Sequence, residues 1–356
     1  MTRIAQLEPT RVTVGVDTHR DVHVAVALDQ LGRRLGELEL ATTRAGYQRL
    51  LAWAERFGAV EAFGIEGTGC YGAGLARHLR ARKVLVIEVM RPNRQTRRRK
   101  GKSDPTDAEA AARAVLSAEA AGSPKAGDDL VEMIRVLRVA RSTAIKARTQ
   151  AINALRSLLV TAPPELRDEL RALSTSRLVG KAARLRSGPL DSPLTASKLA
   201  LRHLARRYQA LEAEITSLDT QLAQLTAAAS PRLLEAFGVG ADTAGALLVA
   251  AGDNPERLRS EAAFSMLCGS SPINASSGKT NRHRLNRGGN RQANAALHRI
   301  VLVRMRYHQP TRAYVDRRTS EGKSKREIMR CLKRYVAREV YTALTQPGEQ
   351  KLARAA

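Results

Sequence analysis

The chain has 356 residues, enough for two or three hydrophobic cores, and its 60 Lys and Arg against 34 Asp and Glu give a formal net charge of +26. Such a charge is self-repulsive unless an anionic partner offsets it, and nucleic acid or an anionic membrane is the usual partner. The sequence contains no apolar run of about 18 residues and no apolar stretch typical of a signal peptide. We therefore expect no membrane association and a cytoplasmic protein, associated with the nucleoid.

Residues 10–122 have the pattern of a mixed α/β domain. Apolar residues alternate through 11–28 with one short polar link, which predicts a β-hairpin. Beyond it we expect strands at 32–40, 59–67 and 83–89, and helices at 44–58, at 71–82 and from Pro105 onward. The order β-β-β-α-β-α-β-α is that of a ribonuclease-H-like domain with a mixed sheet.

Residues 123–229 change character and read as mostly helical. Two long helical patterns, 130–160 and 195–228, are separated by Pro- and Gly-containing breakers. This favours an antiparallel helical hairpin or a coiled-coil arm, which could serve dimerisation. An ordinary helical subdomain fits the pattern equally well.

Residues 230–346 form a third, helical segment. A Gly-Val-Gly turn between two helical patterns places Gly238 and Gly240 as in a helix-hairpin-helix, whose backbone amides grip a phosphate, although a generic tight turn has the same signature. From Arg299 to Arg338 there are 13 Lys and Arg against three acidic residues. A solvated helix face usually balances its charges, so this excess favours a nucleic-acid-binding face.

Four carboxylates occupy positions that the predicted fold would bring together. Asp17 ends the first strand, Glu66 ends the fourth, and Asp104 and Asp107 lie on one face of the first turn of the helix near Pro105. With the first and fourth strands adjacent and this helix across them, all four acids converge. Like charges that close need cations, and two Mg²⁺ ions, which Mn²⁺ could replace, would clamp a phosphodiester there.

Each of these acids also has a simpler interpretation. Asp104 could be a helix N-cap with Pro105 at N1 and Asp107 at N3, and for this pair in isolation capping is the more common pattern. Asp17 could close a hairpin turn and Glu66 could be an ordinary acid at the end of a strand. Asp21 and Asp29 lie close enough in sequence to compete with Asp17.

Cationic runs flank the acids and recur near a polar loop. The first run directly precedes the acidic pair and consists of Arg91, Arg94, Arg97, Arg98, Arg99, Lys100 and Lys102. The second follows the serines of the loop and consists of Lys279, Arg282, Arg284, Arg287 and Arg291. Because aromatic residues are only 3% of the chain, binding through backbone phosphates is favoured over stacking on bases.

The polar loop itself holds a candidate nucleophile. Ser276 and Ser277 precede Gly278 among these cations, which could stabilise charge developing on phosphorus during attack by a serine. A flexible loop that only binds phosphate is the alternative, and on chemistry alone it is favoured.

Taken together, these motifs resemble those of the DEDD transposases of bacterial insertion sequences and the related Piv-type DNA invertases. In the N-terminal half, which is also similar to the RuvC Holliday-junction resolvase, they are "GVDTHRD", "GIEGTGCYG" and "KSDPTDA". In the C-terminal half they are "FGVGADTAGALLVAAGD", "LCGSSPINASSGKT" and "RGGNRQANAAL". After the histidine of the first motif, Arg20 and Asp21 depart from many relatives, which leaves the role of that turn open.

The resemblance implies a division of labour. The acidic tetrad Asp17, Glu66, Asp104 and Asp107 would bind Mg²⁺, and Ser277, or alternatively Ser276, would become transiently linked to DNA. It further implies double-stranded donor and target DNA, a guiding non-coding RNA as in bridge-RNA-guided recombinases, and a homodimer or homotetramer. A RuvC-like nuclease that forms no covalent intermediate is the alternative function.

Overall fold

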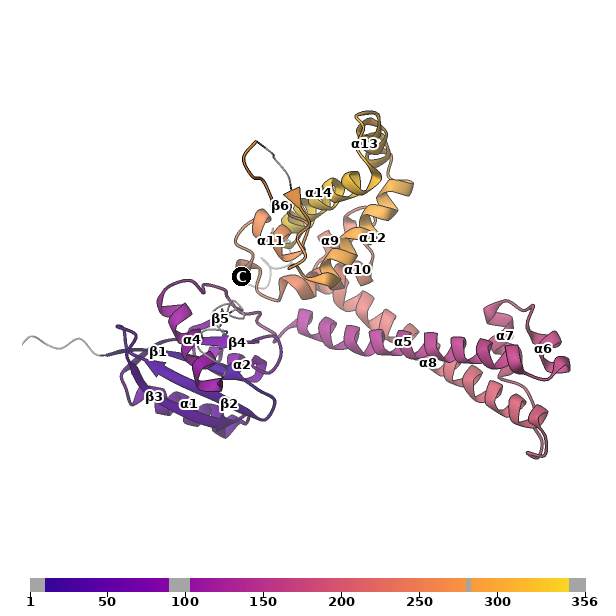
Figure 1. Cartoon of the computed structure of the whole chain (residues 1–356), viewed down its shortest axis with the longest axis horizontal. Coiled ribbons are helices and arrows are strands. Elements are labelled where there is room, and N and C mark those ends of the chain that lie inside the picture. The colour runs from indigo at the N-terminus through magenta and orange to yellow at the C-terminus, as the bar shows by residue number, and fades with distance from the viewer. Residues whose placement is uncertain (1–9, 90–102, 280–282, 346–356) are drawn as a thin grey trace, which may run out of the picture. The chain divides into compact units, whose positions relative to one another are not determined.

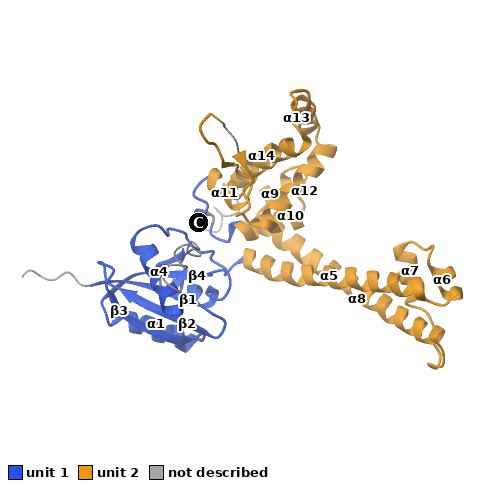
Figure 2. Ribbon diagram, in the orientation of Figure 1, with its two compact units in different colours: residues 1–129, 251–260 blue, residues 130–250, 261–356 orange. Residues whose placement is uncertain are grey.

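The computed structural model describes residues 10–89, 103–279 and 283–345 of the chain (Figure 1). The chain divides into two compact units, the first from residues 1–129 and 251–260, and the second from residues 130–250 and 261–356 (Figure 2). The cations predicted at 91–102 and at Arg282 lie outside the described residues. In the part that is described, no helix is both long and apolar enough to cross a lipid bilayer.

Unit 1 is built on a five-stranded mixed sheet of order β3-β2-β1-β4-β5. Its strands are β1 Arg11–Thr18, β2 Val22–Leu28, β3 Arg34–Ala41, β4 Ala59–Glu66 and β5 Val86–Val89. The pairs β1–β2 and β2–β3 are antiparallel, whereas β1–β4 and β4–β5 are parallel. The predicted hairpin and the adjacency of the first and fourth strands are confirmed, and the architecture fits a ribonuclease-H/RuvC-like fold.

Alternation along β1 assigns its residues to the two faces of the sheet. Val12, Val14 and Val16 are buried in the core beneath the helices α1 (Arg44–Glu55) and α2 (Ala73–Arg80). Gly15 and Asp17 therefore point to the opposite face, where α4 (Asp104–Leu116) packs.

Helix α4 approaches the sheet closely because small residues line both surfaces. A Cβ atom on Gly15 would overlap the carbonyl oxygen of Ala108, and one on Gly64 would lie 2.6 Å from Val115 Cγ2. The helix supplies Ala108 and Ala112 to this contact, both fully buried. Its N-terminus is thereby fixed over the ends of β1 and β4.

Residues 251–260 also belong to unit 1, although they follow the long helices of unit 2 in the sequence. Asn254, which is buried, accepts a hydrogen bond from the Ala126 amide and donates one to the Pro124 carbonyl, both at 3.0 Å. The Arg257 guanidinium donates to the Ser123 carbonyl at 2.9 Å and pairs with Glu88 of β5 at 3.3 Å. These contacts hold residues 251–260 to unit 1 although both flanks belong to unit 2.

Unit 2 contains the two predicted long helices as an antiparallel pair, α5 (Leu130–Thr161) and α8 (Pro193–Ala229). Arg141 pairs with Asp219, and Arg148 pairs with Glu212 at 2.5 Å. Higher residue numbers on α5 therefore meet lower residue numbers on α8, as in an antiparallel pair. Two short helices, α6 (Pro164–Leu170) and α7 (Thr175–Ala182), share a leucine-rich core with the pair. Coiled-coil geometry and dimerisation through this pair stay predictions.

The remainder of unit 2 is helical with one small hairpin. Its elements are α9 Pro231–Glu235, α10 Ala241–Ala251, α11 Glu261–Leu267, β6 Ile273–Asn274, β7 His283–Arg284, α12 Arg291–Tyr307, α13 Gln309–Ser320 and α14 Lys325–Thr345. Gly238 adopts φ +80° in the turn between α9 and α10, a conformation that favours glycine. Because α9 has only five residues, the helix-hairpin-helix stays a prediction, as does the division into three domains at 122 and 229.

Candidate active site at the ends of β1 and β4

The end of β1 carries two side chains that point to the α4 side of the sheet. Asp17 lies within the strand and faces Val24 of β2, and His19 follows two residues later. The Asp17 side chain is only 13% exposed, whereas His19 is about half exposed. The Thr18 hydroxyl, between them, donates a 2.8 Å hydrogen bond to the Glu66 carbonyl, which joins the ends of β1 and β4.

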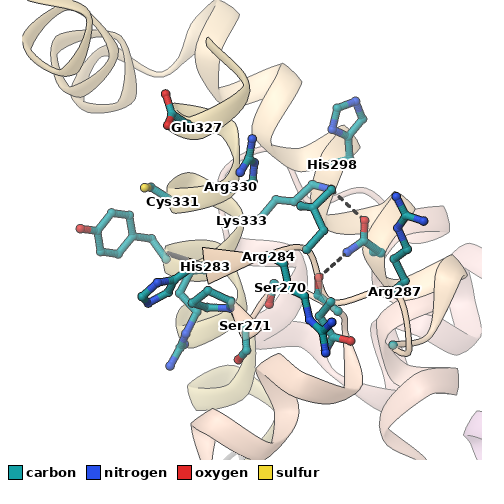
Figure 3. Close-up of a pocket in the computed structure, with 18 of the residues that line it drawn as sticks. Ser270, Ser271, His283, Arg284, Arg287, His298, Glu327, Arg330, Cys331 and Lys333 are labelled. Atoms are coloured by element: carbon teal, nitrogen blue, oxygen red, sulfur yellow. Dashed lines mark hydrogen bonds between the residues drawn. The ribbon is translucent and has the colours of Figure 1, made fainter. Parts of the chain in front are cut away.

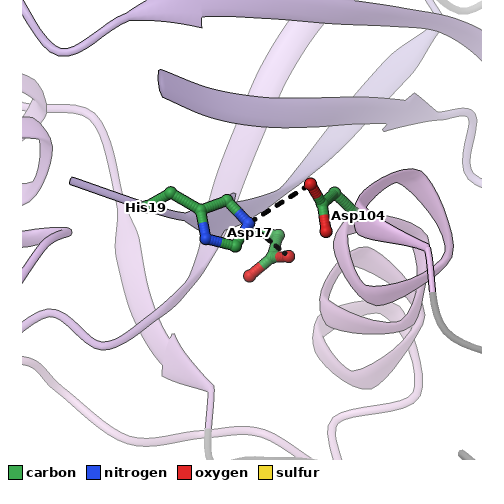
Figure 4. A group of neighbouring side chains, drawn as sticks. All are labelled: Asp17, His19 and Asp104. Atoms are coloured by element: carbon green, nitrogen blue, oxygen red, sulfur yellow. Dashed lines mark ion pairs between the residues drawn. The ribbon is translucent and has the colours of Figure 1, made fainter. Parts of the chain in front are cut away.

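Helix α4 brings its first turn to the same place. The His19 Nε2 atom lies 3.3 Å from Asp17 Oδ2 and 3.4 Å from Asp104 Oδ2 (Figure 4). Asp17, His19 and Asp104 each present one possible ligand atom, and these atoms all lie within 4.8 Å of one another. Residues from two distant parts of the sequence thus form one polar cluster.

The electrostatics of Asp17 reflect the other three predicted acids. Burial raises the pKa of Asp17 above its usual value, and although His19 opposes that rise, the negative charges of Asp107, Glu66 and Asp104 add to it. Asp107 is itself largely buried. The protein therefore concentrates like charges at one partly desolvated point, and the roles of the four acids stay a prediction.

Capping of α4 by Asp104 is not what the structure shows, so that alternative interpretation is wrong. The N-cap residue is Ser103, and Asp104 is the first residue of the helix, with its carboxylate against His19. The hydroxyl of Ser103 meets that of Thr106 at 2.7 Å and makes no hydrogen bond to the helix backbone. Asp104 therefore faces the cluster and does not cap the helix.

The competing acids Asp21 and Asp29 are placed elsewhere. Asp29 accepts hydrogen bonds from the Leu31 and Arg33 amides in the turn after β2, at the opposite end of the sheet from Asp17. Asp21 is 84% exposed beside Arg20. Neither belongs to the cluster, which leaves Asp17 as the acid that β1 contributes.

His19 is the member of the cluster that sequence reasoning missed. A signal was available, because residues i and i+2 of an extended segment point to the same side, so a histidine two residues after Asp17 shares its face.

The side chains of the cluster fit a divalent cation. Carboxylate oxygens are the ligands that Mg²⁺ prefers, and an imidazole nitrogen widens the choice toward transition metals such as Mn²⁺. A cation would also offset the burial and the repulsion that together raise the pKa of Asp17. Asp17, His19 and Asp104 could hold an ion directly, with Asp107 and Glu66 beside them.

In unit 2, the predicted serines lie in the loop between β6 and β7. Ser277 is exposed, and the Ser276 hydroxyl donates a 2.6 Å hydrogen bond to Asn274 Oδ1. Gly278 follows with φ +54°. Lys279 is exposed in the same loop, whereas Arg284, Arg287 and Arg291 line a hollow next to it.

Several cations of the segment 299–338 serve the fold. Arg304 is buried, donates to the Phe237 carbonyl at 2.8 Å and pairs with Glu339 at 2.7 Å. Arg334 and Arg338 pair with Glu261. Only part of this charge is therefore left for an external anion, and the binding face stays a prediction.

Comparison with known families agrees with this arrangement. Residues 14–164 match a family model for transposases of the DEDD IS110 type, and residues 230–316 match the model described as the transposase IS116/IS110/IS902 family. The two matches together span more than half of the chain. A search of curated proteins finds no match.

Proposed function

Because the chain belongs to the IS110 family of DEDD transposases, whose activity is the cutting and rejoining of DNA at an insertion sequence, we propose that it carries out strand transfer with an acidic metal site and a serine nucleophile. The observation that carries the first part is the convergence of Asp17, Asp104, Asp107 and Glu66 at the ends of the parallel strands β1 and β4. Such a concentration of carboxylates is unfavourable without cations.

Asp17, Asp104, Asp107 and Glu66 would hold Mg²⁺, with His19 as an additional ligand. When bound, two such ions can stabilise the attacking and leaving oxygens of a phosphodiester. The side chains would orient the ions, and the close contact of α4 with the sheet at Gly15 supports a fixed distance between Asp17 on β1 and Asp104 on α4.

Ser277 would supply the covalent step. Its Oγ atom forms a bond to phosphorus as the bond between phosphorus and one deoxyribose oxygen breaks, the serine proton passes to solvent, and the leaving oxygen takes up a proton. A second strand end then displaces the serine and restores it. Exposure of Ser277 beside Gly278 and Lys279 supports access by a DNA strand.

We also propose that a non-coding RNA guides the protein and that it acts as a homodimer or homotetramer. The net charge of +26 supports contact with nucleic-acid backbone. Met133, Val136 and Val139 recur on α5 and are each at least half exposed, which supports a partner helix packing on this face.

Trapping of protein–DNA adducts tests the serine. With a DNA duplex carrying an element end and Mg²⁺, we expect the wild type to give a covalent adduct on a denaturing gel, and Ser277→Ala to bind DNA normally but give none. Ser276→Ala is the matched control and should retain the adduct. Cleavage without any adduct in the wild type would instead favour a RuvC-like nuclease.

A further inference from the structure

Unit 2 contains a half-open hollow with a volume of about 1280 Å³ whose walls are strongly basic (Figure 3). It lies between the base of the β6–β7 hairpin, the start of α12 and the middle of α14. Seven cationic side chains line it, namely Arg284, Arg287, Arg291, Lys323, Arg330, Lys333 and Arg334. The acidic residue among the lining side chains is Glu327.

One acidic and one cationic side chain of the walls are already engaged with other residues. Glu327 accepts hydrogen bonds from the amide and hydroxyl of Ser324, at 2.9 and 2.7 Å, at the start of α14. Arg334 is neutralised by Glu261. Most of the positive charge in the hollow therefore has no counter-charge within its walls.

Lys333 is a cation of this hollow that is held by a neutral side chain. Its Nζ atom donates a 2.8 Å hydrogen bond to Asn294 Oδ1 and is partly buried. The amide nitrogen of Asn294 donates to the carbonyls of Cys268 and Gly269, at 2.8 and 3.1 Å, which fixes its oxygen toward the lysine. Among the described residues, Lys333 forms no ion pair, so its one close partner is a neutral amide.

A half-buried ammonium with a neutral partner is unfavourable in the free protein. Burial lowers the pKa of Lys333, and the positive charge of Lys333 adds to burial in lowering the pKa of His298 nearby. An anion beside Nζ would relieve this cost and gain a charge-assisted hydrogen bond. The exposed Arg287 and Arg330 at the rim would contact further anionic groups of the same ligand.

We propose that this hollow seats the phosphodiester backbone of a nucleic acid, with one phosphate on Lys333 and the neighbouring phosphates on the rim arginines. Cations contributed by three elements around an open hollow suit an extended polyanion rather than a single small ion. The proposal rests on the proposed function only in taking nucleic acid as the partner, and it involves neither Ser277 nor the acidic cluster.

The test is binding of a fluorescent duplex of about 20 base pairs in EDTA, over a series of salt concentrations, so that no metal-dependent step contributes. Parallel DNA and RNA duplexes of the same sequence distinguish the source of the backbone. We expect Lys333→Gln to weaken binding to at least one of them about tenfold and to reduce the slope against salt by about one. The charge-matched control is Arg207→Gln, an exposed site on α8, which should change binding less than twofold.

Lys333→Gln retains a donor for Asn294 and removes an unpaired charge, so its melting temperature should not fall. Equal weakening by Lys333→Gln and Arg207→Gln would overturn the proposal. Should the variant fail to fold, chemical acetylation of lysines in the wild type is compared with and without nucleic acid, and mass spectrometry measures the extent of modification at Lys333. DNA or RNA must protect Lys333, and protection by inorganic phosphate alone would overturn the assignment of a nucleic-acid backbone.

Discussion

Two aspartates of this protein, Asp17 in unit 1 and Asp242 in unit 2, are both partly buried, yet their surroundings are opposite. Asp242 lies in the first turn of α10 and forms ion pairs with Arg138 of α5 at 2.6 Å and with Arg299 of α12 at 2.5 Å. Burial acts to raise the pKa of Asp242, but these two arginines outweigh it and hold that pKa below its usual value. Burial and three neighbouring carboxylates instead hold the pKa of Asp17 above it.

The difference shows that the charged carboxylate of Asp242 stabilises the fold, whereas the charged carboxylate of Asp17 destabilises it. Asp242 joins three helices through charge-assisted hydrogen bonds. At Asp17, burial and the neighbouring carboxylates outweigh the favourable effect of His19 and disfavour the charged form, as is common at sites that bind a cation. Changes at the two positions should therefore have opposite effects on stability and unequal effects on activity.

The largest expected effect is on activity. Asp17→Asn or Asp104→Asn removes a ligand from the cluster and should lower Mg²⁺-dependent DNA cleavage by at least about a thousandfold, equivalent to about 4 kcal/mol. Cleavage assays with purified protein measure this, and Asp242→Asn is the control for a general loss of fold. Cleavage at near-normal rates by either variant of the cluster would contradict the metal site.

Gly15→Val should act on the same site through packing. The new side chain would collide with the backbone of α4 at Ala108, so α4 must shift or the domain unfold, at a cost of about 3 kcal/mol or more. Chemical denaturation monitors stability, and calorimetric titration with Mn²⁺ reports whether the ligand set is still assembled. Unchanged stability would contradict the close contact between α4 and Gly15 of β1.

Asp242→Asn should destabilise the protein by about 2 kcal/mol, because it leaves Arg138 and Arg299 without their shared charge. The reference is Asp219→Asn on α8, whose carboxylate is more exposed and faces Arg141, and it should cost less. Thermal unfolding at neutral pH orders the two variants. The reverse order would argue against Asp242 as the main link between these helices.

Without metal, Asp17 and Asp242 should contribute to the pH dependence of the free energy of unfolding with opposite signs. The folded protein binds a proton on Asp17 more tightly than the unfolded chain does, so lowering the pH through the folded pKa toward 3.8 relieves the repulsion. Asp17→Asn should thus melt higher than wild type at pH 7 in EDTA, with the gap closing toward pH 4. For Asp242 the stabilisation is present above pH 3.8 and is lost only as the pH falls below it through the folded pKa.

The smallest expected effect is at His19, which lies at the rim of the cluster. His19→Gln removes a nitrogen ligand but no carboxylate, so the affinity for Mn²⁺ should fall a few-fold while that for Mg²⁺ changes less. Titration calorimetry with each ion gives both affinities. A larger loss for Mg²⁺ than for Mn²⁺ would show that His19 acts by positioning the aspartates rather than as a ligand.

The sequence alone determined where the four predicted acids lie along their strands and helix. Strand alternation fixes the face on which Asp17 and Glu66 lie, and parallel pairing of β1 with β4 brings their carboxyl ends together. Helical spacing places Asp104 and Asp107 side by side. The alternation and the helical spacing are short-range periodicities that can be read before any tertiary contact is known, whereas the pairing of β1 with β4 follows from the predicted fold.

What only the tertiary structure decided is how each charge is compensated. Thirteen cations between Arg299 and Arg338 look alike in sequence, but Arg304 is buried against Glu339, Arg334 meets Glu261, and Lys333 has only a neutral amide. The partners come from elements far away in sequence, and periodicity carries no information about them. Burial and charge pairing depend on which surfaces finally meet, and this separates cations that stabilise the fold from those left for a ligand.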